Sequence, residues 1–393
     1  MSQASSSAEN LHAVTTAQRA VLINGAAVYD IRDCENPLWK GDIRWPSPLS
    51  AHNSTVGPDA KKVYASFGVQ VADITNLDDA NSWTARDYAC DVLAQYHPLW
   101  AYLATTGQCQ ALPERGTAMS HEPALNKSGT RLYLAGQQPQ PYESVLLILD
   151  ITTDPPTLIS SLDQRPGHGM RPVTIGGKAF LLHSDETAPG IPQDAERRAN
   201  GCLTDGGTPF TGPAQPVLTD ISDETHPVTI SQMTLAINRQ EPEFCAAELS
   251  SSVNSTSHYH EVDDPDHATF AMLSMKNAGL RIFDIRDPSA PKEVAYFNPG
   301  QYRAPDGSTL LDRARQHTHY DASTQKIWLT TESHGFYVLD FEPQVRDALA
   351  LPEPSAALSI AAAAALLCCL RPNRVSTRLQ RATAGPGSPA RPR

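Results

Sequence analysis

Histidines recur in this sequence about one strand length before apolar segments such as KVYAS and KIWLT. Seven follow this pattern: His52, His121, His168, His258, His260, His317 and His319. The apolar segments have the length and composition of β-strands, so each histidine is expected near the start of a preceding strand. Residues two apart in a strand share a face, which places the pairs in HYH and HTH together. Imidazoles gathered from several strands favour zinc, iron or copper.

Five of these histidines are the candidate metal ligands: His121, His258, His260, His317 and His319. The carboxylates of Glu122, Glu261 and Asp263 are near enough in sequence to complete a ligand shell or orient a ring. No H-E-x-x-H motif is present, so this prediction depends on strand placement alone. The alternative is that each ring hydrogen-bonds to neighbouring backbone and lines a polar channel. No other cofactor is indicated.

Other kinds of chemistry lack their motifs. There is no G-x-S-x-G segment, which argues against serine hydrolysis. The glycines of GHGMRPVTIGG do not have the phosphate-loop pattern or a following helix. The formal net charge is -12 and the chain has no basic stripe in its repeats, so a nucleic acid is excluded as the expected partner.

The residues from Gly279 to Gly300, GLRIFDIRDPSAPKEVAYFNPG, form the clearest of several related strand-turn-strand units. Large side chains occupy both faces of the first strand, as in a strand that is covered on both sides. Asp287 and Pro288 end it, because Asp bonds to its own backbone two residues on and Pro fixes φ. Each unit has an aspartate near the strand end: Asp30, Asp73, Asp150, Asp220, Asp284 and Asp340.

The spacing of these aspartates favours a propeller over a solenoid. Successive intervals are 43, 77, 70, 64 and 56 residues, whereas a stacked solenoid has a fixed short period. Four-stranded units of roughly 40 residues with variable insertions fit propeller blades. We therefore predict an all-β fold, a β-propeller of six or seven four-stranded blades, in which the histidines converge at one mouth of the channel. Residues 11–18, LHAVTTAQ, are the N-terminal candidate for a ring-closing strand.

The unit GLRIFDIRDPSAPKEVAYF resembles the LVIVD-repeat β-propeller family, and the resemblance covers about residues 20–345. It implies a propeller fold of a type that is often found on exported bacterial proteins. The biochemical activity of the family is largely undefined, so the resemblance implies an architecture and not a reaction.

Composition divides the chain into a mobile N-terminal segment, 1–18, a propeller, 19–345, and a C-terminal tail, 346–393. Within the tail, residues 355–370, SAALSIAAAAALLCCL, are uncharged, and every charged residue after them is an arginine. We predict a short membrane anchor whose arginines remain in the cytoplasm. Because a helix of this length reaches only about 24 Å, the alternatives are an alanine-rich surface helix or a disordered tail.

Five of the seven cysteines lie in the propeller region. Cys90 and Cys109 bracket one long connection, and Cys202 and Cys245 lie in irregular insertions, so these two pairs are predicted disulfides. The alternative is a set of buried or idle thiols in a cytosolic protein. No signal peptide is visible at the N-terminus, so an exported protein would need a start upstream of the recorded one.

Together these features predict an extracytoplasmic binding or interaction module. Its partner is expected to be a protein or a small-molecule ligand on a propeller face, with membrane association through the tail. The alternative function is a metal-dependent enzyme with a histidine-lined site at one mouth of the channel. Metal analysis of the purified protein separates the two, because a binding scaffold has no reason to hold near-stoichiometric metal.

Overall fold

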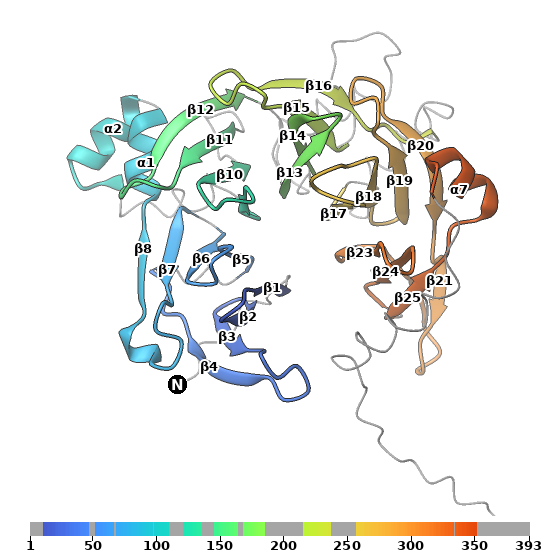
Figure 1. The fold of residues 1–393 in the computed structure, drawn as a ribbon, viewed down its shortest axis with the longest axis horizontal. Coiled ribbons are helices and arrows are strands. Elements are labelled where there is room, and N and C mark those ends of the chain that lie inside the picture. Colours follow the sequence, from blue (N-terminus) through green and yellow to red (C-terminus); the bar gives the residue numbers. More distant parts are fainter. Residues whose placement is uncertain are drawn as a thin grey trace, which may run out of the picture.

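The computed structural model describes residues 11–46, 52–66, 68–96, 98–109, 121–135, 145–163, 168–184, 215–236, 257–333 and 335–351. Their strands form six blades around a central axis, and the first strand of each blade lies nearest to it (Figure 1). The predicted fold class is confirmed, and the number of blades is six.

Five of the six described blades have four antiparallel strands. Blade 1 consists of β1 (Leu11–Thr15), β2 (Ala20–Asn24), β3 (Ala27–Asp30) and β4 (Leu38–Asp42). Blade 2 consists of β5 (Ser54–Val56), β6 (Lys62–Ala65), β7 (Gln70–Asp73) and β8 (Thr84–Asp87). Blade 3 consists of β9 (Ala124–Leu125), β10 (Arg131–Ala135), β11 (Val145–Asp150) and β12 (Thr157–Asp163). Blade 4 consists of β13 (Met170–Ile175), β14 (Lys178–His183), β15 (Val217–Asp220) and β16 (Val228–Gln232). Blade 5 consists of β17 (His260–Val262), β18 (Phe270–Ser274), β19 (Leu280–Asp284) and β20 (Lys292–Phe297).

Blade 6 is shorter, with three described strands: β23 (Thr318–Asp321), β24 (Lys326–Thr330) and β25 (Phe336–Leu339). A hairpin of β21 (Gln301–Arg303) and β22 (Thr309–Leu311) precedes this blade, and α7 (Pro343–Leu349) follows it. Among the described residues, no N-terminal strand pairs with β25 to close the ring, contrary to our expectation.

The N-terminal strand instead belongs to blade 1. Strand β1 pairs antiparallel with β2 from Leu11 to Thr15, within the segment that we expected to be mobile. The chain reverses near Thr16, whose hydroxyl accepts a hydrogen bond from the amide of Arg19 at 3.0 Å. This tight local turn explains why residues 11–15 pair with the strand that follows them rather than with a distant blade.

The clearest sequence repeat occupies β19 and β20, and β19 is covered on both faces. All residues of β18 and four of the five in β19 are buried. Phe283 packs in the core shared with blade 4, whereas Ile282 packs in the core shared with blade 6. Successive side chains therefore enter different cores, as the alternation of a β-strand requires.

The turns after the third strands have the predicted chemistry. Oδ1 of Asp284 accepts a hydrogen bond from the amide of Arg286 at 3.0 Å, and Oδ1 of Asp287 accepts one from Ser289 at 3.0 Å. The same bond, at 2.8 to 3.1 Å, is made by Asp30, Asp73, Asp150 and Asp220. These aspartates are therefore turn residues. Asp340, which is close to α7, pairs instead with Lys326.

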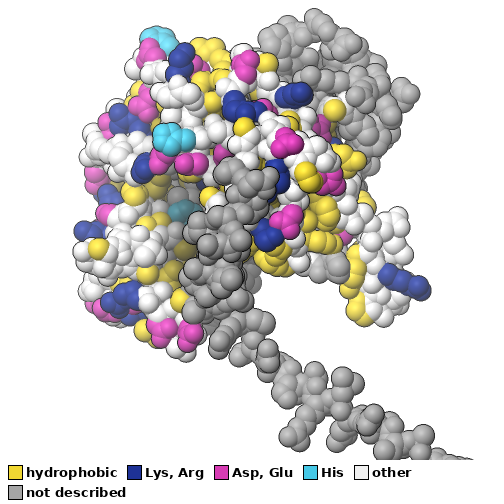
Figure 2. Space-filling model, turned by 45° about the vertical axis from the view of Figure 1, so that its right-hand side comes forward, with side chains coloured by type: hydrophobic (Ala, Val, Ile, Leu, Met, Phe, Trp, Pro, Cys, Tyr) yellow, Lys and Arg dark blue, Asp and Glu magenta, His cyan; other side chains and the backbone are white. Residues whose placement is uncertain are grey.

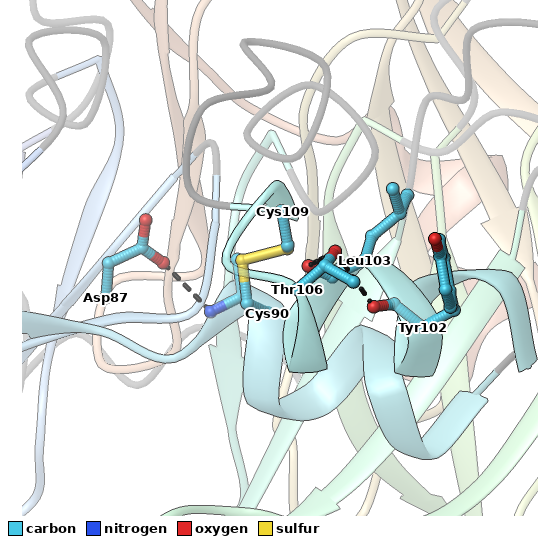
Figure 3. Close-up of a disulfide and its surroundings, with 7 residues drawn as sticks. Asp87, Cys90, Tyr102, Leu103, Thr106 and Cys109 are labelled. Atoms are coloured by element: carbon cyan, nitrogen blue, oxygen red, sulfur yellow. Dashed lines mark hydrogen bonds between the residues drawn. A yellow bond between two sulfur atoms is a disulfide. The ribbon is translucent and has the colours of Figure 1, made fainter.

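Among the described residues, helices occur mainly in the connections of blade 2. A short 3-10 helix, η2 (Ala80–Ser82), precedes β8, and α1 (Ala89–Tyr96) and α2 (Pro98–Thr105) follow it. A disulfide joins Cys90 to Cys109, with their Cα atoms 5.9 Å apart (Figure 3). The carboxylate of Asp87 accepts a hydrogen bond from the amide of Ala89 at 2.9 Å where α1 begins. The predicted Cys90–Cys109 bond is confirmed.

Two predictions concern residues outside the described ranges. These are the Cys202–Cys245 disulfide and the candidate membrane segment 355–370. Across the part of the chain that is described, no helix has the length and apolar character needed to cross a membrane.

Candidate functional site

The two ends of the channel are formed by different parts of each blade. One histidine stands one to three residues before each of the strands β5, β9, β13, β17 and β23. We call the end at which these innermost strands begin the histidine end. Because the strands of a blade alternate in direction, the tight turns that follow the first and third strands lie at the opposite end. We call that the turn end.

Five histidines and one tyrosine, contributed by blades 2 to 6, contact one another at the histidine end. This histidine cluster consists of His52, His121, His168, His258, Tyr259 and His317. The ring of His168 lies between those of His121 and His258, with centroids 3.9 and 4.2 Å away. Tyr259 continues the contact to His317, whose ring centroid is 3.7 Å from its own. The convergence that the sequence predicted is therefore present.

Hydrogen bonds define the roles of the ring nitrogens in two members of the cluster. Nδ1 of His121 accepts from Nδ2 of Asn53 at 3.0 Å, which places the ring proton on Nε2, 2.9 Å from Nε2 of His52. Nδ1 of His258 donates to the carbonyl oxygen of Arg315 at 2.5 Å. The lone pair of neutral His258 is therefore on Nε2. Each of these two rings has one defined donor and one defined acceptor.

Burial keeps the central rings of this end uncharged. His168 is fully buried, and burial lowers its pKa well below the usual value. The neighbouring rings of His121 and His258 lower the pKa of His168 further, because a second positive charge beside the first is unfavourable. Burial likewise lowers the pKa of His260 well below the usual value. Neutral imidazole is the form that binds metal ions.

A second group of polar side chains lies around Gly169, beside the histidine cluster. Oε1 of Glu122 is 3.4 Å from Nε2 of His317. A Cβ atom at position 169 would collide with Oε2 of Glu122 and would lie 3.4 Å from Cε1 of His260. His260 is buried, and its Nδ1 has no hydrogen-bond partner. A carboxylate and two imidazoles therefore approach one another where residue 169 has no side chain.

Four of the five predicted ligand residues lie at the histidine end: His121, His258, His260 and His317. His319 does not join them, because it is exposed and its ring contacts Trp328, with centroids 5.9 Å apart. The HTH pair was expected to share one face of a strand. However, β23 begins only at Thr318, and His317 follows a bend, so the regular alternation does not include it.

Sequence reasoning left four members of this region out of the ligand set: His52, Asn53, His168 and Tyr259. Two of them, His52 and His168, occupy the repeated histidine position. Asn53 and Tyr259 each stand directly after such a histidine. The sequence signal that could have identified Asn53 and Tyr259 was therefore their position directly after a repeated histidine.

The rings of the cluster bond to or stack on one another. Among the described residues, no group of three or more His, Cys, Asp or Glu side chains has its donor atoms arranged to hold a metal ion. Two surface hollows, of about 750 and 940 Å³, lie elsewhere. The first is beside α7, between blades 5 and 6, and the second is at the turn end of blades 3 to 5.

On the face shown in Figure 2, acidic and basic side chains lie among one another and form no continuous basic stripe. Phosphate backbones bind to such stripes.

No protein-family model matches the chain, and no curated protein matches it. The solved structures that are similar in fold include the following three. A protein from Lactobacillus plantarum has a TM-score of 0.45 and 10% identity, over 84% of this chain and 83% of that one. Kuenenia stuttgartiensis hydrazine synthase has a TM-score of 0.45 and 11% identity, over 90% and 84%. Saccharomyces cerevisiae Sqt1 has a TM-score of 0.43 and 6% identity, over 85% and 76%. At this similarity the comparisons carry no argument about function.

Proposed function

We propose that this protein is a binding module whose ligand site is the histidine end of the propeller channel. One observation carries the proposal, namely that polar rings from five blades meet there in a largely buried cluster. Buried polar groups at such density are costly unless a structural or binding role offsets them. The turns at the opposite end need no such explanation, because their polar residues satisfy their own backbone.

We propose further that the blades are LVIVD-type repeats and that the protein is extracytoplasmic. The unit at Gly279–Gly300 supports the first statement. The Cys90–Cys109 disulfide supports the second, since such bonds persist in oxidising compartments. The composition of residues 355–370 supports a membrane anchor. A protein truncated near Pro354 should therefore be absent from the membrane fraction, whereas the full-length protein should be found there.

The ligand site can be tested by thermal unfolding in the presence of defined probes. Zinc chloride, cobalt chloride, sodium phosphate and sodium acetate are each added to the wild-type protein and to two variants. A probe at 100 times its Kd stabilises the folded state by about 2.7 kcal/mol. We expect at least one probe to raise the unfolding temperature of the wild type, and the shift to be lost in His52→Ala.

The matched control is Lys127→Ala, at the turn end, where the lysine side chain is 82% exposed and pairs with Asp266. This variant should respond to the probe as the wild type does. A shift that survives in His52→Ala but disappears in Lys127→Ala would overturn the proposal, and so would the absence of any shift in the wild type.

A metal-dependent enzyme is the second candidate function. The observation in its favour is that the rings of His168 and His260 are held neutral, which is the state required of imidazole ligands. Near-stoichiometric zinc, iron or copper in the purified protein supports this candidate, and its absence supports a metal-free binding module.

A further inference from the structure

We propose that Glu122, His260 and His317 bind one divalent first-row transition metal ion beside Gly169. This inference rests on the proposed function, because it names the ligand class of the same end of the channel. The predicted ligands His121, His258 and His319 are not part of this set. The proposal is carried by the separation of the donor atoms, by a buried ring nitrogen without a partner, and by the missing side chain at position 169.

The carboxylate of Glu122 and the ring of His317 are already separated by a suitable distance. Oε1 of Glu122 and Nε2 of His317 are 3.4 Å apart. Two donors that each lie about 2.1 Å from a tetrahedral metal ion are themselves about 3.4 Å apart. An ion between these two atoms therefore requires no increase in their separation.

His260 supplies the third donor. Its side chain is buried, with 4% of the residue exposed, and its Nδ1 has no hydrogen-bond partner. A buried polar atom without a partner calls for a structural explanation such as a bound ion. Cε1 of His260 faces the same space at Gly169 into which the carboxylate of Glu122 reaches. The three donors do not yet surround one point, so binding requires the His260 ring to turn.

Gly169 allows this approach. A Cβ atom there would collide with the carboxylate of Glu122. Gly169 does not have a positive φ angle. A glycine at position 169 therefore provides space for the carboxylate and not an unusual backbone conformation.

The surrounding charges suit a divalent cation. Arg171, which lowers the pKa of His260 through its positive charge, is paired with Glu261 at 3.0 Å. The pair is neutral overall, so the carboxylate of Glu122 remains to offset the metal charge. Two imidazoles and one carboxylate favour zinc or iron(II), whereas calcium and magnesium prefer sites made of oxygen donors.

Cobalt(II) titration of the metal-free protein tests this site, because cobalt reports its coordination in the visible spectrum. The wild type should bind one ion per chain with a coordinated d-d band. His260→Ala and Glu122→Gln should each raise the Kd at least about tenfold. Gly169→Ala should do the same, because its methyl group displaces the carboxylate. Unchanged far-ultraviolet circular dichroism shows that each variant is folded.

His319→Ala is the matched control, since it removes an exposed histidine of blade 6 outside the site. It should bind cobalt like the wild type. Equal cobalt affinity in the wild type, Glu122→Gln and Gly169→Ala would overturn the metal site, as would no binding by the wild type. A phosphate or acetate shift that depends on His52 would then still support the binding module, so the two proposals fail separately.

Discussion

The turn end and the histidine end of the propeller are both rich in polar residues, but they use them differently. At the turn end, Asp284 and Asp287 bond to the amides of Arg286 and Ser289 in their own turn. At the histidine end, the partner of His258 is a carbonyl of blade 6, and that of His121 is a side chain of blade 2. The local turn bond recurs in blades 1 to 5, whereas each of the bonds between blades occurs at one place.

The two ends also differ in charge. Hydrogen bonding to Arg286 lowers the pKa of Asp284, and hydrogen bonding to Ser289 lowers that of Asp287, so both stay ionised. At the other end, burial lowers the pKa values of His168, His183 and His260, so these rings stay neutral. The turn end is thus stabilised by charged groups near water, and the histidine end depends on uncharged groups away from it.

The largest expected effect is a loss of stability in mild acid, to which the buried histidines of the histidine end contribute. Burial lowers the pKa of His183 from 6.5 to about 4. Above pH 6.5 its ring is neutral in both states, and between 6.5 and about 4 only the unfolded chain gains the proton. Stability is therefore lost as the pH falls, by roughly 3 kcal/mol for this residue alone. Urea unfolding across this range measures the loss.

The aspartates of the turn end should act in a lower pH window. Their stabilisation is present above their unfolded pKa of 3.8 and is lost as the pH falls through their lowered folded values. The variant His183→Leu isolates the contribution of His183 to the loss between pH 6.5 and about 4. Neither ring nitrogen of His183 has a hydrogen-bond partner, so the substitution leaves no other polar group unpaired. Between pH 6.5 and about 4, it should reduce the slope of the free energy of unfolding against pH by about 1.4 kcal/mol per pH unit. An unchanged slope would contradict the assignment.

A second effect of similar size concerns the connection that leaves blade 2 at the histidine end. This connection contains α1 and α2 and is closed by the Cys90–Cys109 disulfide (Figure 3). The double variant Cys90→Ala, Cys109→Ala should lower the free energy of unfolding by about 3 kcal/mol, mainly by freeing the unfolded chain. Cys34→Ala serves as the control, because Cys34 is outside the bond. Equal loss in both variants would mean that the bond contributes nothing.

The smallest effect is expected at the turn end, in two aspartates that occupy equivalent repeat positions. Asp284→Ala removes a turn hydrogen bond to Arg286 and should cost about 1 kcal/mol. Asp340→Ala removes only an exposed pair with Lys326 and should change stability by less than about 0.5 kcal/mol. Chemical unfolding of both variants compares them. An equal loss of unfolding free energy in the two variants would show that the turn hydrogen bond is not how the repeated aspartate stabilises the protein.

The elements of the fold that could be predicted are those specified by neighbouring residues. The strand at 280–284 and its turn at Asp287 follow from alternation and from side-chain bonds two residues long. The disulfide was predictable because its cysteines bracket one connection. Strand β1 was assigned to the wrong role, because its pairing with β2 depends on a turn at Thr16 that carries no glycine or proline signal.

The sequence by itself determined that this chain forms blades and that its histidines recur near the starts of inner strands. Those properties arise from short-range periodicity and turn chemistry. The tertiary structure decided which rings meet, because the partners of each ring come from other blades and depend on their number and order. It placed His317 beside Glu122 and left His319 exposed, since β23 begins between them. It also gave Gly169 its importance, because only packing against blades 3 and 5 reveals what a side chain there would displace.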